Sequence, residues 1–148
     1  MLEELLVYAI LLEVGLASNA EYVAYLDALF MKASDNDLLL ALEWGSTDAN
    51  QSISTIRNHC AQCSIDYDAF GRFLFSKLAD IYSQNKIDIQ TFGEKAYAMW
   101  KQFPRSIHQT EPFWTLCYAD DPLSWGDEKQ TRELYEKAFR YYDNKPNP

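Results

Sequence analysis

Apolar residues recur at spacings of three and four along most of the chain, which is the period of a helix buried on one side. The segment after Asp48 shows the pattern clearly, with apolar positions at Ala49, Ile53, Ile56, Cys60 and Cys63. We find no stretch that alternates as a half-buried strand does, and no Asn-Gly pair that marks a hairpin. The pattern predicts an all-α globule of seven or eight short helices, with stacked helix pairs as a variant arrangement.

The segment 2–14 differs from the others because it is apolar almost all round. Its charged residues, Glu3, Glu4 and Glu13, lie only near its ends. Such a segment predicts a helix buried near the centre of the fold and ended by Gly15. A buried strand is the alternative, since periodicity does not distinguish the two in a short apolar run.

Several helix starts are predicted by short polar side chains that can accept hydrogen bonds from free backbone N–H groups. Ser18 and Glu21 have the spacing of a capping box, in which each side chain bonds the backbone N–H of the other. The polar run 34–37 predicts a short helix over 38–44. Further helices are expected to start at Asp48, at Asp88 and within 124–127.

Length and composition favour one folded domain. The chain has 148 residues, of which 48% are hydrophobic, enough for a real core and too many for general disorder. We therefore expect a single helical domain over 1–143, followed by a frayed tail over 144–148.

The net charge of −9 is concentrated at one end of the chain. Residues 1–56 hold nine carboxylates and a single basic residue, Lys32, so this part alone carries −8. An acidic field repels nucleic-acid phosphates and anionic lipid, and it attracts basic proteins. Solubility alone is the simpler explanation of the charge. The predicted partner-binding residues are Glu21, Asp27, Asp35, Asp37, Glu43, Trp44 and Asp48.

A second aromatic and acidic cluster lies between residues 111 and 128. Aromatic side chains beside carboxylates suit either the closure of a core at a helix junction or an acidic binding surface. We favour core closure and keep binding as the alternative. The secondary candidates for partner binding are Trp114, Tyr118, Asp120, Asp121 and Trp125.

The sequence contains one motif that suggests metal or redox chemistry. His59, Cys60 and Cys63 could form part of a zinc site completed by His108 and Cys117, or the two cysteines could exchange disulfides. Cys60 and Cys63 fall at the end of an apolar seam, however, where a free cysteine packs as a small hydrophobe. Core packing is therefore favoured, and no metal or cofactor is expected.

Catalytic motifs are not found in the sequence. His108 and Glu111 could act as an acid–base pair, although a loop histidine more often supports a turn. No nucleophile elbow, phosphate-binding glycine loop or His-Glu-x-x-His occurs. We therefore expect a protein without catalytic activity.

The number of cysteines and the first residues of the chain indicate in which cellular compartment the protein functions. Three cysteines cannot all pair, and Glu3 and Glu4 stand where a signal peptide would be basic. The apolar run 5–12 is too short to cross a bilayer. These features predict a cytoplasmic protein.

Short phrases at 97–104, 111–114 and 118–122, together with the small, acidic and helical character of the chain, resemble bacterial immunity proteins of contact-dependent growth inhibition and related polymorphic toxin systems. The resemblance implies a protein that binds the toxic domain of a cognate effector, commonly a nuclease with a basic cleft, and blocks it. An acidic inhibitor would suit such a toxin. A helical-repeat adaptor that binds a peptide or regulatory protein is the alternative from another class.

Overall fold

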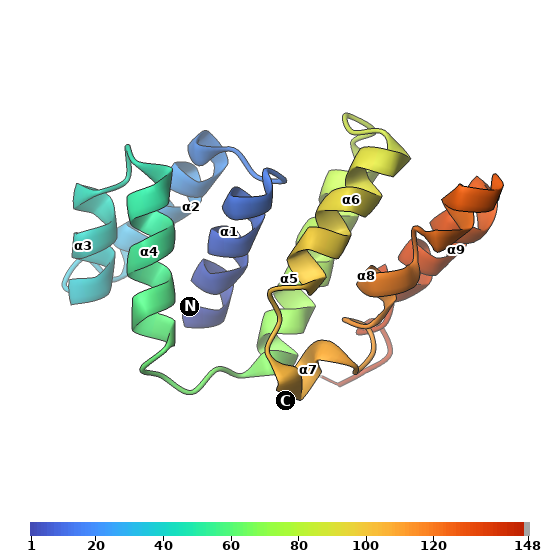
Figure 1. Ribbon diagram of the computed structural model, residues 1–148. Helices are drawn as coiled ribbons and strands as arrows, with labels where there is room; N and C mark the ends of the chain where they lie inside the picture. Colours follow the sequence, from blue (N-terminus) through green and yellow to red (C-terminus); the bar gives the residue numbers. More distant parts are fainter. Residues whose placement is uncertain (147–148) are drawn as a thin grey trace. The chain divides into compact units, whose positions relative to one another are not determined.

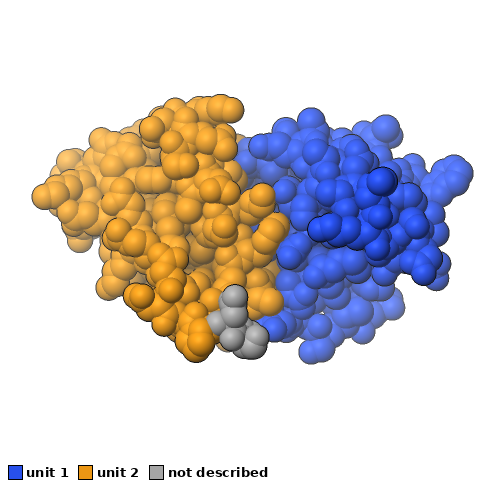
Figure 2. Space-filling view, turned by 180° about the vertical axis from the view of Figure 1, so that it is seen from behind, with its two compact units in different colours: residues 1–66 blue, residues 67–148 orange. Residues whose placement is uncertain are grey.

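The computed structural model describes residues 1–146. All regular secondary structure in this part of the chain is helical, and it contains no strand. The all-α prediction is therefore confirmed. Nine α-helices and one 3-10 helix occur in the described residues, more than the seven or eight expected. The chain divides into two compact units, residues 1–66 and 67–148 (Figure 2). The prediction of a single domain over 1–143 stays a prediction.

The first unit contains four helices in two packed pairs. Helix α1 (Leu2–Val14) lies beside α4 (Ala49–Cys60), and α2 (Asn19–Lys32) packs against α3 (Asp37–Trp44), as Figure 1 shows. An ion pair also joins α4 to α1, with 2.6 Å between Arg57 Nη2 and Glu13 Oε2. Turns with local capping connect the four helices.

Helix α1 forms the core of the first unit. Every residue from Leu5 to Leu11 is buried, as an all-round apolar helix requires. Tyr8 stacks on Tyr25 of α2 with ring centroids 4.6 Å apart, and the Tyr25 hydroxyl donates a hydrogen bond to Glu4. Gly15 ends the helix in the left-handed region at φ 75°. The strand alternative for this segment is therefore wrong.

The helix starts of the first unit largely follow the capping signals. The predicted capping box is present, because Glu21 N donates to Ser18 Oγ and Ser18 N donates to Glu21 Oε2. Asp48 caps α4 as expected. At α3 the cap is Asn36, which accepts from Leu39 N, and not a residue earlier in the polar run. Local hydrogen bonding thus fixes three of the four starts.

The second unit consists of longer helices and a chain of short ones. Their order and bounds are α5 (Tyr67–Ser83), α6 (Ile89–Trp100), α7 (Arg105–His108), α8 (Thr115–Tyr118), the 3-10 helix η1 (Asp121–Trp125) and α9 (Glu128–Phe139). Helix α9 contacts α5, α8 and η1, and α8 also packs on α6. The single-turn helix α7 was not predicted.

Aromatic side chains fill the core of the second unit in two groups. The first surrounds Phe113, whose ring lies 5.4 Å from Phe103, 5.7 Å from Phe75 and 6.1 Å from Phe70, centroid to centroid. The second group brings together rings from α5, α6 and α9, namely Tyr82, Phe92, Tyr135 and Phe139. The core of this unit therefore depends on ring contacts between helices.

Two glycines follow phenylalanines in this unit and permit close packing. A Cβ at Gly71 would collide with the Tyr142 hydroxyl and would lie 2.9 Å from Phe113 Cζ. A Cβ at Gly93 would lie 2.7 Å from Asp120 Cβ. Neighbouring groups occupy the space that a larger residue would need, so a side chain at either position would force a neighbour to move.

The end of the described chain is bound to α5. Arg72 Nη2 donates to the carbonyl of Pro146 at 2.9 Å, and Nη1 reaches the carbonyls of Lys145 and Tyr142 at 3.4 and 3.5 Å. The last two residues of the predicted frayed tail, 147–148, lie outside the described residues.

Candidate protein-binding surface

Helix α3 exposes a stripe that contains large apolar side chains. Leu39 and Leu42 are buried against the unit, while Asp37, Leu40, Ala41 and Trp44 are exposed at the spacing of one helical face. Trp44 is 88% exposed. A tryptophan at this exposure contributes nothing to the core of its own unit, and its aromatic surface is available to a partner.

Helix α2 presents a similar exposed face. Tyr22 and Leu26 are fully buried, whereas Met31 is 85% exposed. The other exposed positions of this helix are mostly small or acidic, and they include Ala20, Ala24, Asp27 and Ala28. We call the exposed residues of these two packed helices the α2–α3 surface, defined by Asp27, Met31, Asp37, Leu40 and Trp44.

The predicted residues lie on α2, on α3 and in the turns that flank α3. Asp35 and Asp37 lie at the start of α3, while Glu43, Trp44 and Asp48 lie at its end and in the following turn. Asn19 Nδ2 donates to the carbonyl of Ser46 at 2.9 Å, which places the start of α2, and with it Glu21, beside that turn. The structure therefore gathers all seven predicted residues within three consecutive helices of the first unit.

Two of these carboxyl groups interact directly across the α2–α3 contact. Burial raises the pKa of Glu43, and the charge of Asp27 and a hydrogen bond to it raise this pKa further. The Glu43 Oε1 atom is also buried and has no hydrogen-bond partner among the described residues. A cation placed near this pair would relieve the repulsion between the two carboxylates.

Other predicted residues have a structural role that does not exclude binding. Glu21 completes the capping box of α2. Asp48 accepts hydrogen bonds from Asn50 N at 3.0 Å and Gln51 N at 3.3 Å, and its side chain stays exposed. Substitution of these two residues would alter helix stability as well as surface charge. Asp27, Asp35 and Asp37 are better positions for a test of binding.

The secondary cluster between residues 111 and 128 divides into a packed part and an exposed part. Trp114 is half-buried and lies edge-on to Trp100 at 5.9 Å, while Tyr118 OH donates to Glu111 Oε1 at 3.1 Å. Asp120 is half-buried against Gly93. Of the five candidate residues in this cluster, Asp121 and Trp125 are exposed, the latter at 63%.

The cysteine motif does not form one packed seam. Cys60 is buried at the end of α4, whereas Cys63 is exposed in the turn that follows, so the seam ends one turn earlier than predicted. Burial, followed by the charges of Cys63 and Glu3, raises the pKa of the Cys60 thiol to about 11. Such a thiol is protonated at neutral pH and is a poor nucleophile. In residues 1–146, no three His, Cys, Asp or Glu side chains are grouped as metal ligands.

The suggested acid–base pair is separated by other contacts. The His108 ring stacks on Trp100 with centroids 3.8 Å apart, and Trp100 Nε1 donates to the His108 carbonyl. Glu111 instead accepts from Thr115 N and Oγ1 and from Tyr118. Both residues therefore hold the short helices α7 and α8 in place.

Sequence reasoning missed Met31 and Leu40 as exposed apolar residues. In a helix as short as α3, with three leucines in succession, periodicity does not show which face is buried. Within residues 1–146, no helix has both the length and the apolar composition needed to cross a bilayer. No family model, curated protein or solved structure matches this chain.

Proposed function

We propose that this chain is a non-catalytic binding protein that neutralises a basic protein, as an immunity protein does with its cognate toxin. The observation that carries the proposal is Trp44, which is 88% exposed on the unit that holds nearly all the net charge. Tryptophan is enriched among the residues that dominate binding energy at protein interfaces, where a partner buries it. Met31 and Leu40 offer further apolar area on the same two helices.

The charge of this unit supports a basic partner. Residues 1–66 contain ten carboxylates and two basic side chains, a net charge of −8. Asp27 is exposed on α2, and Asp35 and Asp37 are exposed just before and at the start of α3. A field of this sign accelerates encounter with a positively charged protein and disfavours acidic competitors.

Inhibition of this kind requires only a stable surface. A basic cleft that normally receives phosphate would be covered by the acidic helices, and the apolar side chains would exclude water from the contact. A cationic side chain of the partner would be favoured beside Asp27 and Glu43, where it would offset the repulsion within the carboxyl pair. The cytoplasm, where such a toxin acts, is part of the same proposal.

The test begins with the recovery of the partner and ends with two matched variants. The full chain is used to capture proteins from its native cell lysate at low and high salt, and a single basic protein is then purified. One variant carries Asp27→Lys, Asp35→Lys and Asp37→Lys. The other carries Asp80→Lys, Glu133→Lys and Glu136→Lys, three exposed carboxylates of the second unit, so that both variants change the charge equally.

We expect the first variant and Trp44→Ala to weaken binding by about 100-fold or more, and to abolish neutralisation of the partner's activity. The second variant should bind within a few-fold of the unaltered chain. Equal loss in both variants would show that only net charge matters. Capture of several partners, with affinity that does not depend on salt, would favour the adaptor and contradict the proposal.

A further inference from the structure

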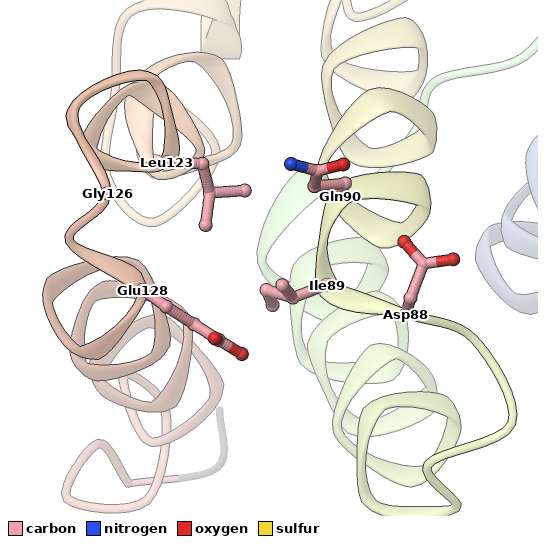
Figure 3. Close-up of a pocket in the computed structure, with 6 residues that line it drawn as sticks. All are labelled: Asp88, Ile89, Gln90, Leu123, Gly126 and Glu128. Carbon is pink, nitrogen blue, oxygen red and sulfur yellow. The ribbon is translucent and has the colours of Figure 1, made fainter.

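The second unit contains an open cleft between the start of α6 and the segment that joins η1 to α9 (Figure 3). Its volume is about 420 Å³. Leu123 and Glu128 extend from one side toward Gln90 and Ile89 on the other, as Figure 3 shows. None of these four residues was predicted to form a site, since they lie far apart in the sequence.

The walls of the cleft combine apolar and acidic groups. Ile89 and Leu123 are both half-buried and provide apolar surface from opposite sides. Glu128 is exposed, and its Oε1 accepts from Arg132 Nε at 3.0 Å and Nη2 at 2.8 Å. Its other oxygen, Oε2, accepts no hydrogen bond from the residues that the structure describes. The cleft therefore suits a ligand with an apolar stem and a hydrogen-bond-donating head.

The same three elements carry further acceptors one helical turn away. Thr131 follows Glu128 by three residues on α9, and Asp120 precedes Leu123 by three. Thr131 and Tyr135 are fully buried, and their hydroxyl oxygens have no hydrogen-bond partner among the described residues. Burial raises the pKa of Asp120, with smaller contributions from Asp121 and Glu94. These groups lie on the elements around the cleft and are not among the residues that line it.

The helix starts at the cleft do not make it an anion site. The free N–H groups of a helix start attract anions when nothing caps them. Here Asp88 accepts from Thr91 N at 2.8 Å, and Asp127 accepts from Gln130 N at 3.1 Å. The protein's own carboxylates already occupy these positions, so an incoming anion would meet like charge.

We propose that this cleft binds a cationic side chain of a protein partner, lysine or arginine, with its methylene stem between Ile89 and Leu123 and its charged head at Glu128. Trp125, which is 63% exposed on η1, provides aromatic surface for the residues that flank this side chain. The identity of the partner as a basic protein rests on the proposed function. Recognition of the side chain itself does not, because a free lysine derivative would occupy the cleft in the same way.

The experiment uses the full chain labelled with 15N and titrated with Nα-acetyl-lysine methylamide. The norleucine analogue, which has the same stem without the ammonium group, is the ligand control. We expect saturable shifts of the amide signals of Gln90, Leu123 and Gly126 with the lysine derivative, and much smaller shifts with norleucine. Nα-acetyl-arginine methylamide should give shifts similar to those of the lysine derivative.

Two matched variants locate the charge that matters. Glu128→Gln should weaken binding of the lysine derivative by about threefold or more, whereas Glu133→Gln, on the same helix outside the cleft, should leave it unchanged. Leu123→Ala should weaken binding by removal of the stem contact. The amide spectrum of each variant shows whether the fold is intact, since Glu128→Gln also removes an ion pair with Arg132.

Three results would overturn the inference. Equal shifts with norleucine would mean that the cleft takes only apolar groups. Equal weakening by Glu133→Gln would mean diffuse attraction to α9, and the lack of any saturable shift would mean that the cleft binds neither ligand. These outcomes do not depend on the partner or on the α2–α3 surface, so either proposal can fail while the other stands.

Discussion

The two units differ in what they bury and in what they expose. The first unit holds five of the 22 aromatic residues and a net charge of −8, whereas the second holds seventeen aromatic residues and a net charge of −1. An apolar helix, α1, forms the core of the first unit, while ring contacts between helices form that of the second. The single tryptophan of the first unit, Trp44, is 88% exposed and follows Glu43 in the sequence. The first unit thus leaves its tryptophan exposed, whereas the second packs many of its aromatic rings into its core.

Among the substitutions that test this difference between the units, Phe113→Ala is expected to have the largest effect on the free energy of unfolding. The substitution removes a buried ring that contacts three other phenylalanines, and we expect a loss of about 3–5 kcal/mol in the free energy of unfolding. Urea denaturation followed by circular dichroism measures this loss. The control is Trp44→Ala, an exposed aromatic residue of the first unit, which should change stability by less than about 0.5 kcal/mol. Similar losses in both variants would remove the distinction between a structural and a recognition aromatic residue.

A smaller effect is expected where the aromatic core approaches a helix backbone. Gly71→Ala gains about 1 kcal/mol of helix propensity and loses more through the clash with Tyr142 and Phe113, for a net loss of about 1–2 kcal/mol. Tyr142→Phe removes the hydroxyl group that lies nearest to a Cβ at position 71. In a double-mutant cycle the Gly71→Ala loss should therefore shrink in the Tyr142→Phe background. An unchanged loss would mean that another group limits the space at Gly71.

The capping signals allow a comparison within the first unit. Ser18→Ala should cost about 1 kcal/mol, because the reciprocal hydrogen bonds with Glu21 are lost. Ser34→Ala, in the polar run before α3, should cost less than about 0.5 kcal/mol because Asn36 provides that cap. Denaturation midpoints of the two variants measure the difference. A larger loss at Ser34 would contradict the assignment of Asn36.

The smallest expected effect concerns pH and the equivalent cap of the second unit. Hydrogen bonds from the Thr91 backbone and side chain lower the pKa of Asp88 below its ordinary value of 3.8. The ionised Asp88 carboxylate therefore contributes to the free energy of unfolding above pH 3.8. This contribution is lost as the pH falls through the lowered pKa. The stability difference between the unaltered chain and Asp88→Ala should therefore decrease from about pH 6 to about pH 3. A difference that does not change with pH would argue against a charged cap.

The elements that could be predicted from sequence are those controlled by neighbours along the chain. The capping box at Ser18, the caps at Asp48 and Asp88, and the end of α1 at Gly15 depend on residues within four positions of each other. Helix α7 was not predicted because its single turn is stabilised by the stacking of His108 on Trp100. These residues are eight positions apart, and the helical spacing of apolar residues does not predict their contact.

The sequence predicts the negative charge of the candidate site, but it does not predict which side chains the fold exposes there. The acidic residues of the first unit could be counted, and Trp44 could be named as an anchor. The exposure of Met31 and Leu40 depends on which face of each helix the unit buries, and the cleft at Leu123 and Glu128 depends on packing between distant segments. The close packing at Gly71 and Gly93 likewise depends on residues distant in the sequence, Tyr142 and Asp120.

The exposure of Trp44 also has an optical consequence. An indole ring surrounded by water emits at longer wavelength than one enclosed by protein, and Trp100 and Trp114 are already half-enclosed. If a partner covers α3, the emission of Trp44 should move to shorter wavelength and become less accessible to acrylamide, and Trp44→Phe should remove that part of the change. Trp125 is also exposed, at 63%, and Trp125→Phe separates its contribution from that of Trp44. The surface proposed for recognition therefore carries its own spectroscopic label, and its occupancy can be followed in real time.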